Sequence, residues 1–151
     1  MNAICRRNVS SVFSAAGEPS TTPAGPPPVA EKSKTLSRSE VFAIGRMPAT
    51  TSRNGGKTWN ILEGVLATGE EIALHESLQP AGSAPNPPHT IQHSELILVQ
   101  EGTLLFEHEG RSERVGPGGV IFVATGSRHA AKNVGDGTAK YLVIAMGGDT
   151  R

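Results

Sequence analysis

The 151-residue sequence has a single cysteine, Cys5, so it cannot form an intramolecular disulfide and contains no CxxC motif for zinc or redox chemistry. It also lacks an excess of charge of either sign. Lys and Arg together number 14, and so do Asp and Glu, which makes the formal net charge zero. A neutral chain has no long electropositive surface for nucleic acid, so we expect no nucleic-acid partner and instead a small-molecule ligand or a protein partner.

Long apolar runs are absent as well. No stretch approaches the 18 or more apolar residues of a membrane span, which excludes a transmembrane helix. We expect no membrane partner. We therefore expect a cytoplasmic protein. The alternative is export, because Arg6-Arg7 precede a weakly apolar stretch within residues 1–17, an arrangement similar to a twin-arginine signal.

Glycine and proline, by contrast, are plentiful, with 18 and 11 residues. Pro, Ser, Thr, Ala and Lys dominate from Glu18 to Arg38, around Pro26-Pro27-Pro28. Such a stretch cannot bury enough apolar surface to offset the entropy of ordering it. We predict a flexible segment over residues 1–38 and one folded domain over residues 39–148, a size typical of a single core.

The folded domain is predicted to be all-β. The gaps between its β-rich runs are mostly too short for crossover helices, so the sheets are expected to be antiparallel. Expected strands cover residues 41–44, 59–65, 71–78, 89–100, 103–108, 111–115, 120–123, 129–133 and 140–146.

Two of these runs, residues 96–99 and 142–145, are apolar without alternation, which is typical of strands covered on both faces. We therefore predict a double-sheet jelly-roll β-barrel with one outer face covered by a second copy of the chain in a homodimer. The large aromatic residues Trp59, Phe106 and Phe122 are assigned to the core.

Three of the five histidines fall within two motifs. The first motif runs from His89 through Ile91 and His93 to Glu95, with Gly102 following after six residues. Imidazole nitrogens and one carboxylate, brought together from different strands, are ligands for a divalent transition metal such as Fe, Mn, Ni, Cu or Zn.

The second motif reads Gly118, five residues, Ala124-Thr-Gly126, two residues, His129, three residues, Asn133. Together the two motifs resemble those of the cupins, which read His-x-His, three or four residues, Glu, six residues, Gly, and Gly, five residues, Pro-x-Gly, two residues, His, three residues, Asn. The resemblance covers about residues 65–147 and implies a cupin barrel in which His89, Glu95 and His129 are metal ligands.

The sequence departs from the cupin pattern at Ile91, which stands where the family has its second histidine. His93 follows two residues later. On a regular strand His93 and Glu95 lie about 7 Å apart on one face and can share an ion. His89 would lie about 20 Å from Glu95 on the same straight strand, so the chain must bend between them. If the bend falls near His93, this side chain points away from the ion, and the sequence leaves both readings open.

We accordingly predict a metal site formed by His89, His93, Glu95 and His129. His75 is interpreted as a half-buried strand residue and His108, beside a hairpin turn, as an exposed one.

The resemblance implies a wide range of functions, since cupins include dioxygenases, decarboxylases, isomerases and lyases. We expect a mononuclear metalloenzyme, an oxidoreductase or lyase, that acts on a small organic substrate, with Glu95 also serving as a catalytic proton acceptor. The alternative is a non-catalytic small-molecule-binding or sensing cupin whose metal site is degenerate or absent. The exchange of a ligand for Ile91 favours that alternative.

Overall fold

The structure, a computed structural model, describes residues 34–150. The twin-arginine-like stretch over residues 1–17 and most of the predicted flexible segment over residues 1–38 lie outside these residues. Within the described residues no α-helix occurs, and none of the elements could cross a membrane as a helix.

Eleven strands and one short 3-10 helix account for the regular structure of residues 34–150, so the all-β prediction is confirmed. In chain order they are β1 (Thr35–Leu36), η1 (Ile44–Arg46), β2 (Thr50–Thr51), β3 (Lys57–Leu66), β4 (Glu71–Gln79), β5 (His89–Thr90), β6 (Gln92–Glu101), β7 (Leu104–His108), β8 (Arg111–Val115), β9 (Val120–Val123), β10 (Arg128–Asn133) and β11 (Ala139–Asp149).

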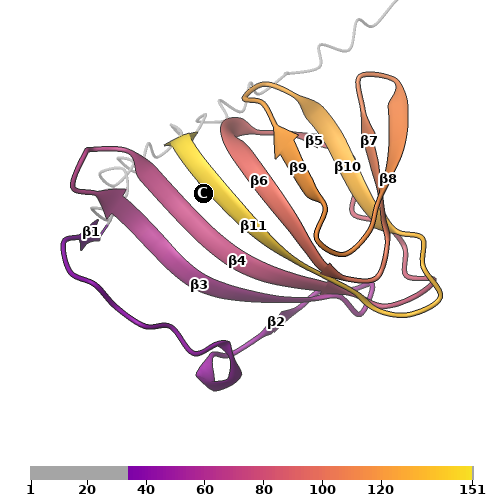
Figure 1. Ribbon diagram of the computed structural model, residues 1–151, viewed down its shortest axis with the longest axis horizontal. Helices are drawn as coiled ribbons and strands as arrows, with labels where there is room; N and C mark the ends of the chain where they lie inside the picture. The colour runs from indigo at the N-terminus through magenta and orange to yellow at the C-terminus, as the bar shows by residue number, and fades with distance from the viewer. Residues whose placement is uncertain (1–33, 151) are drawn as a thin grey trace, which may run out of the picture. The chain divides into compact units, whose positions relative to one another are not determined.

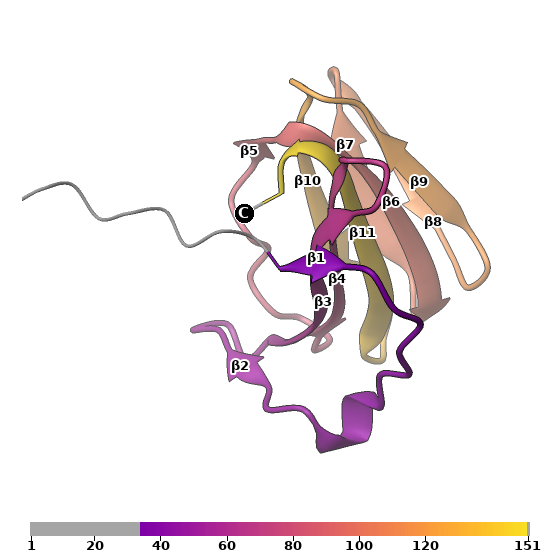
Figure 2. The same ribbon diagram turned by 90° about the vertical axis from the view of Figure 1, so that its left-hand side faces the viewer.

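The strands form two sheets (Figure 1). The large sheet has the order β1-β3-β4-β11-β6-β9, with β2 paired to β3, and the small sheet has the order β5-β10-β7-β8. Pairing is antiparallel as predicted, except between β1 and β3, which run parallel. Figure 2 shows the segment that carries η1 and β2 looping away from the ends of the strands.

A single apolar core contains residues from both sheets. Strand β6 shows how the sequence builds it, because every second side chain, including Ile97 and Val99, is buried while the residues between them face outward. Strand β11 repeats the pattern through Tyr141 and Val143. The buried cluster comprises Ile91, Ile97, Val99, Leu104, Phe106, Ile121, Val123, Ala139, Tyr141 and Val143.

Two glycines permit close backbone contacts. Strand β1, which precedes the domain start predicted at residue 39, packs beside Gly64, where a Cβ atom would collide with the Lys34 carbonyl oxygen. Gly102 of the first motif has a φ of 75° in the turn after β6, and a Cβ there would lie 2.7 Å from the Ala139 Cα atom. Only glycine fits both the dihedral angle and the space at Gly102.

Two local predictions are wrong. Residues 41–44 form no strand, because Val41 is 98% exposed with no neighbouring strand to pair with, and the 3-10 helix η1 begins at Ile44. Phe122 does not enter the core. It occupies an outward position on β9 and is 62% exposed, whereas Phe106 is buried as expected.

The predicted strand over residues 89–100 is interrupted at Ile91. Residues before the break form β5, which pairs with β10 in the small sheet, and residues after it form β6, which pairs with β11 and β9 in the large sheet. The chain therefore crosses from one sheet to the other at Ile91. The Gly126 backbone N–H donates a hydrogen bond of 2.9 Å to the Ile91 carbonyl and fixes this crossing.

Candidate metal centre

The crossing at Ile91 decides the orientation of His93. Because β6 runs without interruption from Gln92, His93 and Glu95 lie two residues apart on the same inward face. Both residues are buried, and His93 Nε2 lies 2.9 Å from Glu95 Oε1. The bend lies before His93, so this imidazole points towards the carboxylate.

His129 reaches the same carboxylate from the opposite sheet. It lies on β10, is 4% exposed, and places its Nε2 atom 3.7 Å from Glu95 Oε2. Burial lowers the pKa of His129 below the ordinary value of 6.5, and the neighbouring His89 lowers this pKa further. The imidazole of His129 is therefore held in its neutral form, which is the form that binds metals.

His89 is brought to the site by the pairing of β5 with β10, in which it lies directly opposite His129. The two ring centroids are 4.6 Å apart. His89 is exposed, in contrast to the buried His93, Glu95 and His129. The structure thus gathers all four predicted ligands at one place between the sheets.

Hydrogen bonds to backbone carbonyls orient the two imidazoles that face Glu95. His93 Nδ1 lies 2.5 Å from the Asp149 carbonyl oxygen, and His129 Nδ1 lies 3.5 Å from that of Ser127. Carbonyls only accept, so Nδ1 of His93 carries the proton, and the same tautomer suits His129. In the neutral rings the Nε2 lone pairs then face the oxygens of Glu95.

Two acceptors such as His93 Nε2 and Glu95 Oε1 approach to 2.9 Å only with a proton or a cation between them. Histidine ligands of metals are typically oriented by such Nδ1–H bonds to carbonyl groups. The chemistry of the donor set therefore fits a divalent transition metal.

The spacing of the donors fits in part. Around an ion with bonds of about 2.1 Å, adjacent donors lie about 3.0–3.4 Å apart. The His93–Glu95 contact of 2.9 Å is close to this range, whereas the His129–Glu95 contact of 3.7 Å exceeds it by a few tenths of an ångström. Within residues 34–150, no group of three or more His, Cys, Asp or Glu side chains is already arranged as a metal-binding group. The side chains would have to draw closer to hold one ion together.

Two cavities adjoin these residues. The inner cavity has a volume of about 240 Å³ and lies between the sheets, against His129, Glu95 and Tyr141. The side cavity, of about 340 Å³, lies against Ile91, His93 and Glu95. His75, His89 and Glu95 border both cavities, so the candidate centre lies between them.

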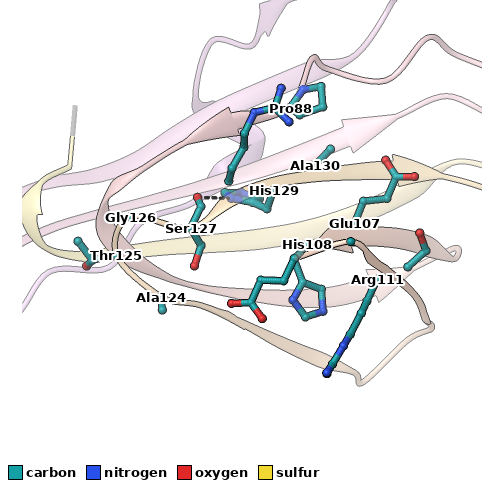
Figure 3. Close-up of a pocket in the computed structure, with 14 residues that line it drawn as sticks. Pro88, Glu107, His108, Arg111, Ala124, Thr125, Gly126, Ser127, His129 and Ala130 are labelled. Carbon is teal, nitrogen blue, oxygen red and sulfur yellow. Dashed lines mark hydrogen bonds between the residues drawn. The ribbon is translucent and has the colours of Figure 1, made fainter.

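A third and larger cavity, the outer pocket, has a volume of about 860 Å³ and reaches His129 from the side of the β7–β8 hairpin. Figure 3 shows His129 beside Ser127, with His108 and Arg111 further along the pocket. His108 is half-buried and not fully exposed as predicted, because its ring stacks on Phe106 with centroids 4.9 Å apart.

His75 is the residue of the site that sequence reasoning left out of the metal set. It lies on β4 in the half-buried state that was predicted, and it faces the same cavities as Glu95. Burial lowers the pKa of His75 below 6.5, while the carboxylate of Glu95 opposes this effect. The available signal was the alternation of His75, Ser77 and Gln79, which places three polar side chains on one face of a strand.

Comparisons with known proteins agree with this fold. The family model described as "Cupin domain" matches residues 74–145. No curated protein matches the chain. Among solved structures, KdgF from Halomonas sp. has a TM-score of 0.61 at 16% identity, with coverage of 72% of this chain and 94% of that chain.

Two further structures are similar. The polyketide cyclase RemF from Streptomyces resistomycificus has a TM-score of 0.59 at 21% identity, covering 72% of this chain and 80% of that chain. A predicted oxalate decarboxylase from Thermotoga maritima has a TM-score of 0.58 at 16% identity, covering 72% of this chain and 99% of that chain. At these identities the similarity concerns the fold alone.

The two facing sheets with strand crossings between them define a jelly-roll barrel of the double-stranded β-helix type, as predicted. Residues 74–145 match the cupin family model, and the fold of the described residues is that of solved cupin structures.

Proposed function

We propose that this cupin holds one divalent transition metal, Fe, Mn, Ni, Cu or Zn, through His89, His93, Glu95 and His129, and that it acts as an enzyme on a small organic molecule. The observation that supports the proposal most strongly is the position of Glu95. Each of its carboxylate oxygens faces the Nε2 atom of a different histidine, and Nδ1 of each histidine faces a backbone carbonyl.

A bound metal would supply Lewis acidity towards a carbonyl, carboxylate or enolate oxygen of the substrate. The chain itself supplies the rest. The Ser127 and Asp149 carbonyls hold two imidazoles in one tautomer. Ile97 and Val143 give the inner cavity an apolar lining beside Glu95. Glu95 is the catalytic proton acceptor when it is not engaged as a ligand.

The reaction class that we propose is that of a metal-dependent oxidoreductase or lyase, which includes dioxygenase-like and decarboxylase-like chemistry, with an isomerase-like reaction as a further member. The similar structure of a predicted oxalate decarboxylase supports this choice only by analogy of fold. The inner cavity admits a small substrate, since its volume is about 240 Å³.

A second candidate function is non-catalytic binding or sensing of a small molecule. Ile91 favours it, because this residue is 4% exposed within the apolar cluster and offers no donor at the position of a family ligand. Metal analysis separates the two functions.

The experiment uses the full chain, stripped with a chelator and then exposed in turn to each of the five metals. We expect one equivalent of one metal to be retained after desalting. Glu95→Gln and His129→Ala should each lose it, and His93→Ala tests whether this residue replaces the ligand missing at Ile91. His108→Ala in the outer pocket is the matched control and should retain the metal. A folded wild-type protein that binds none of the five metals contradicts the proposal.

For location and assembly we propose a cytoplasmic homodimer. The alternative, export, is tested by measuring the mass of the mature protein, which would show whether the N-terminal segment has been cleaved. The outward side chains of Leu98, Val120 and Phe122, which are 36%, 59% and 62% exposed, support the dimer. They form an apolar patch on β6 and β9, with Leu98 directly opposite Val120. Burying such a patch against a second copy removes apolar area from water.

A further inference from the structure

The inner cavity has a polar wall that does not contribute to the proposed metal set. His75, Ser77 and Gln79 extend along β4, and Tyr141 lies on the neighbouring β11, directly opposite Ser77. Ile97 and Val143 lie beside these residues in the same sheet together with Glu95, and β10 of the small sheet contributes His129, Ala130 and Ala131 to the opposite wall. A ligand in this cavity would therefore meet the hydroxyl and amide groups of the large sheet next to the proposed metal set.

The orientation of the Gln79 carboxamide is fixed by its partners. Its Oε1 atom accepts a hydrogen bond of 2.9 Å from the Asn133 backbone N–H, so its Nε2 atom is the donor. That nitrogen donates to the Ala131 carbonyl at 3.3 Å and to the Tyr141 hydroxyl oxygen at 2.8 Å. Because Tyr141 accepts from Gln79, its own proton is directed elsewhere.

The Tyr141 hydroxyl keeps that proton at neutral pH, since burial raises the pKa of the phenol above its usual 10.0. Side-chain hydrogen bonds with Gln79 and Ser77 oppose this rise in the pKa without cancelling it. The phenol is therefore a buried donor held in place at the cavity wall.

The charge of the cavity lining limits what can bind. Among residues 34–150, no lysine, arginine or aspartate lines the inner cavity, and Glu95 is the sole acidic residue there. Arg111 and Arg128 line only the outer pocket. Phosphates and dicarboxylates are normally bound by Arg or Lys, because their charge must be neutralised on burial.

With a divalent ion beside the single carboxylate, the inner cavity would carry one net positive charge, which balances one negative charge on a ligand. The volume of about 240 Å³ corresponds to about eight water molecules at roughly 30 Å³ each. These two limits define both the charge and the size of the ligand.

We propose that the Tyr141 hydroxyl, oriented by Gln79, donates a hydrogen bond to an oxygen of the substrate, and that the substrate is a small hydroxy or carbonyl compound that is neutral or singly anionic. For singly anionic substrates this inference rests on the proposed metal function. For neutral substrates it depends only on the polar wall of the inner cavity.

The test uses the zinc-loaded full chain and four probes of related shape: lactamide, which is neutral; lactate, which carries one charge; and malate and phospholactate, which carry two or more. Binding is measured by titration calorimetry, or by saturation-transfer NMR where affinity is weak. We expect lactate and lactamide to bind, and malate and phospholactate to bind at least about tenfold more weakly. Arg111→Gln in the outer pocket is the control and should leave lactate binding unchanged.

Tyr141→Phe removes only the hydroxyl, and Gln79 Nε2 keeps the Ala131 carbonyl as a partner, so the variant should fold with unchanged metal content. We expect it to weaken lactate and lactamide binding about five- to tenfold, the effect of one lost hydrogen bond. Unchanged affinity in this variant overturns the inference, as does binding of phospholactate or malate as tight as that of lactate. Failure of both lactate and lactamide to bind also overturns it.

Metal content measured on the same samples separates the two proposals. Loss of metal binding with intact lactamide binding refutes the metal function alone. Full metal binding with no effect of Tyr141→Phe refutes the inference alone.

Discussion

Asn133, the last residue of the second motif, is predicted to stabilise the barrel. It is 4% exposed and its side chain makes three hydrogen bonds. Nδ2 donates to the Gln79 carbonyl at 2.9 Å and to the Gly137 carbonyl at 2.8 Å, and Oδ1 accepts from the Gly135 backbone N–H at 3.0 Å. The side chain thus connects the end of β4 to the turn between β10 and β11.

Asn133→Ala removes all three hydrogen bonds. At about 1 kcal/mol for each, the free energy of unfolding should fall by about 3 kcal/mol. For a domain of this size that corresponds to a decrease in Tm on the order of 10 °C. Asn133→Asp preserves the volume and the acceptor for Gly135 but loses both donors, so it should also destabilise the protein by about 2 kcal/mol or more.

Unfolding is followed by urea titration of the chelator-treated chain, because a bound metal would add its own stabilisation. Asn60→Ala, at an exposed position on β3, is the matched control and should change stability by less than about 0.5 kcal/mol. If Asn133→Ala is as stable as this control, the hydrogen bonds contribute nothing and the reasoning is wrong. If Asn133→Asp is as stable as the wild type while Asn133→Ala is not, the effect comes from lost volume.

Two further predictions concern pH and assembly. Burial lowers the pKa of His75 in the folded state below its ordinary value of 6.5. The contribution of the neutral imidazole to stability is therefore complete above pH 6.5. It is lost as the pH falls from 6.5 through the folded-state pKa. The urea midpoint of the metal-free chain should therefore fall as the pH is lowered from 7.5 to 5. In His75→Gln this fall should be smaller. An equally large fall in the variant would refute the assignment. Light scattering should give the mass of a dimer for the wild type and of a monomer for Phe122→Glu. Val41→Glu, at an exposed site outside the apolar patch, is the control and should remain a dimer. A monomeric wild type would contradict the proposed dimer.

The sequence predicted most strands well because their signals are local. Arg111–Val115 and Val120–Val123 have the predicted bounds, and each is closed by turn residues. The strand predicted over residues 41–44 was wrong, because β-branched residues favour a strand only where a partner strand is available. Phe122 was misplaced for a related reason. Its size predicts burial, but its position in the strand alternation of β9 turns it outward.

The candidate site was predictable as a set of residues but not as a geometry. The motif spacing identified His89, Glu95 and His129, and the structure brings them together. Whether His93 joined them depended on where the chain bends, and no glycine or proline marks that point. His75 was missed because its contact with the cavities depends on the pairing of β4 with β11, which is not local in sequence.

The position of Ile91 explains how this cupin domain can lack a family histidine and still place two imidazoles, those of His93 and His129, against Glu95. Ile91 lies at the crossing and His93 lies on β6, and both side chains are buried, so a donor at position 93 also faces inward. A shift by one residue would have turned it away. The vacated position lies where the chain crosses between the sheets, and there an apolar side chain joins the core and borders the side cavity. Ile91 therefore supplies an apolar side chain to the core at the crossing, while His93 supplies the donor beside Glu95.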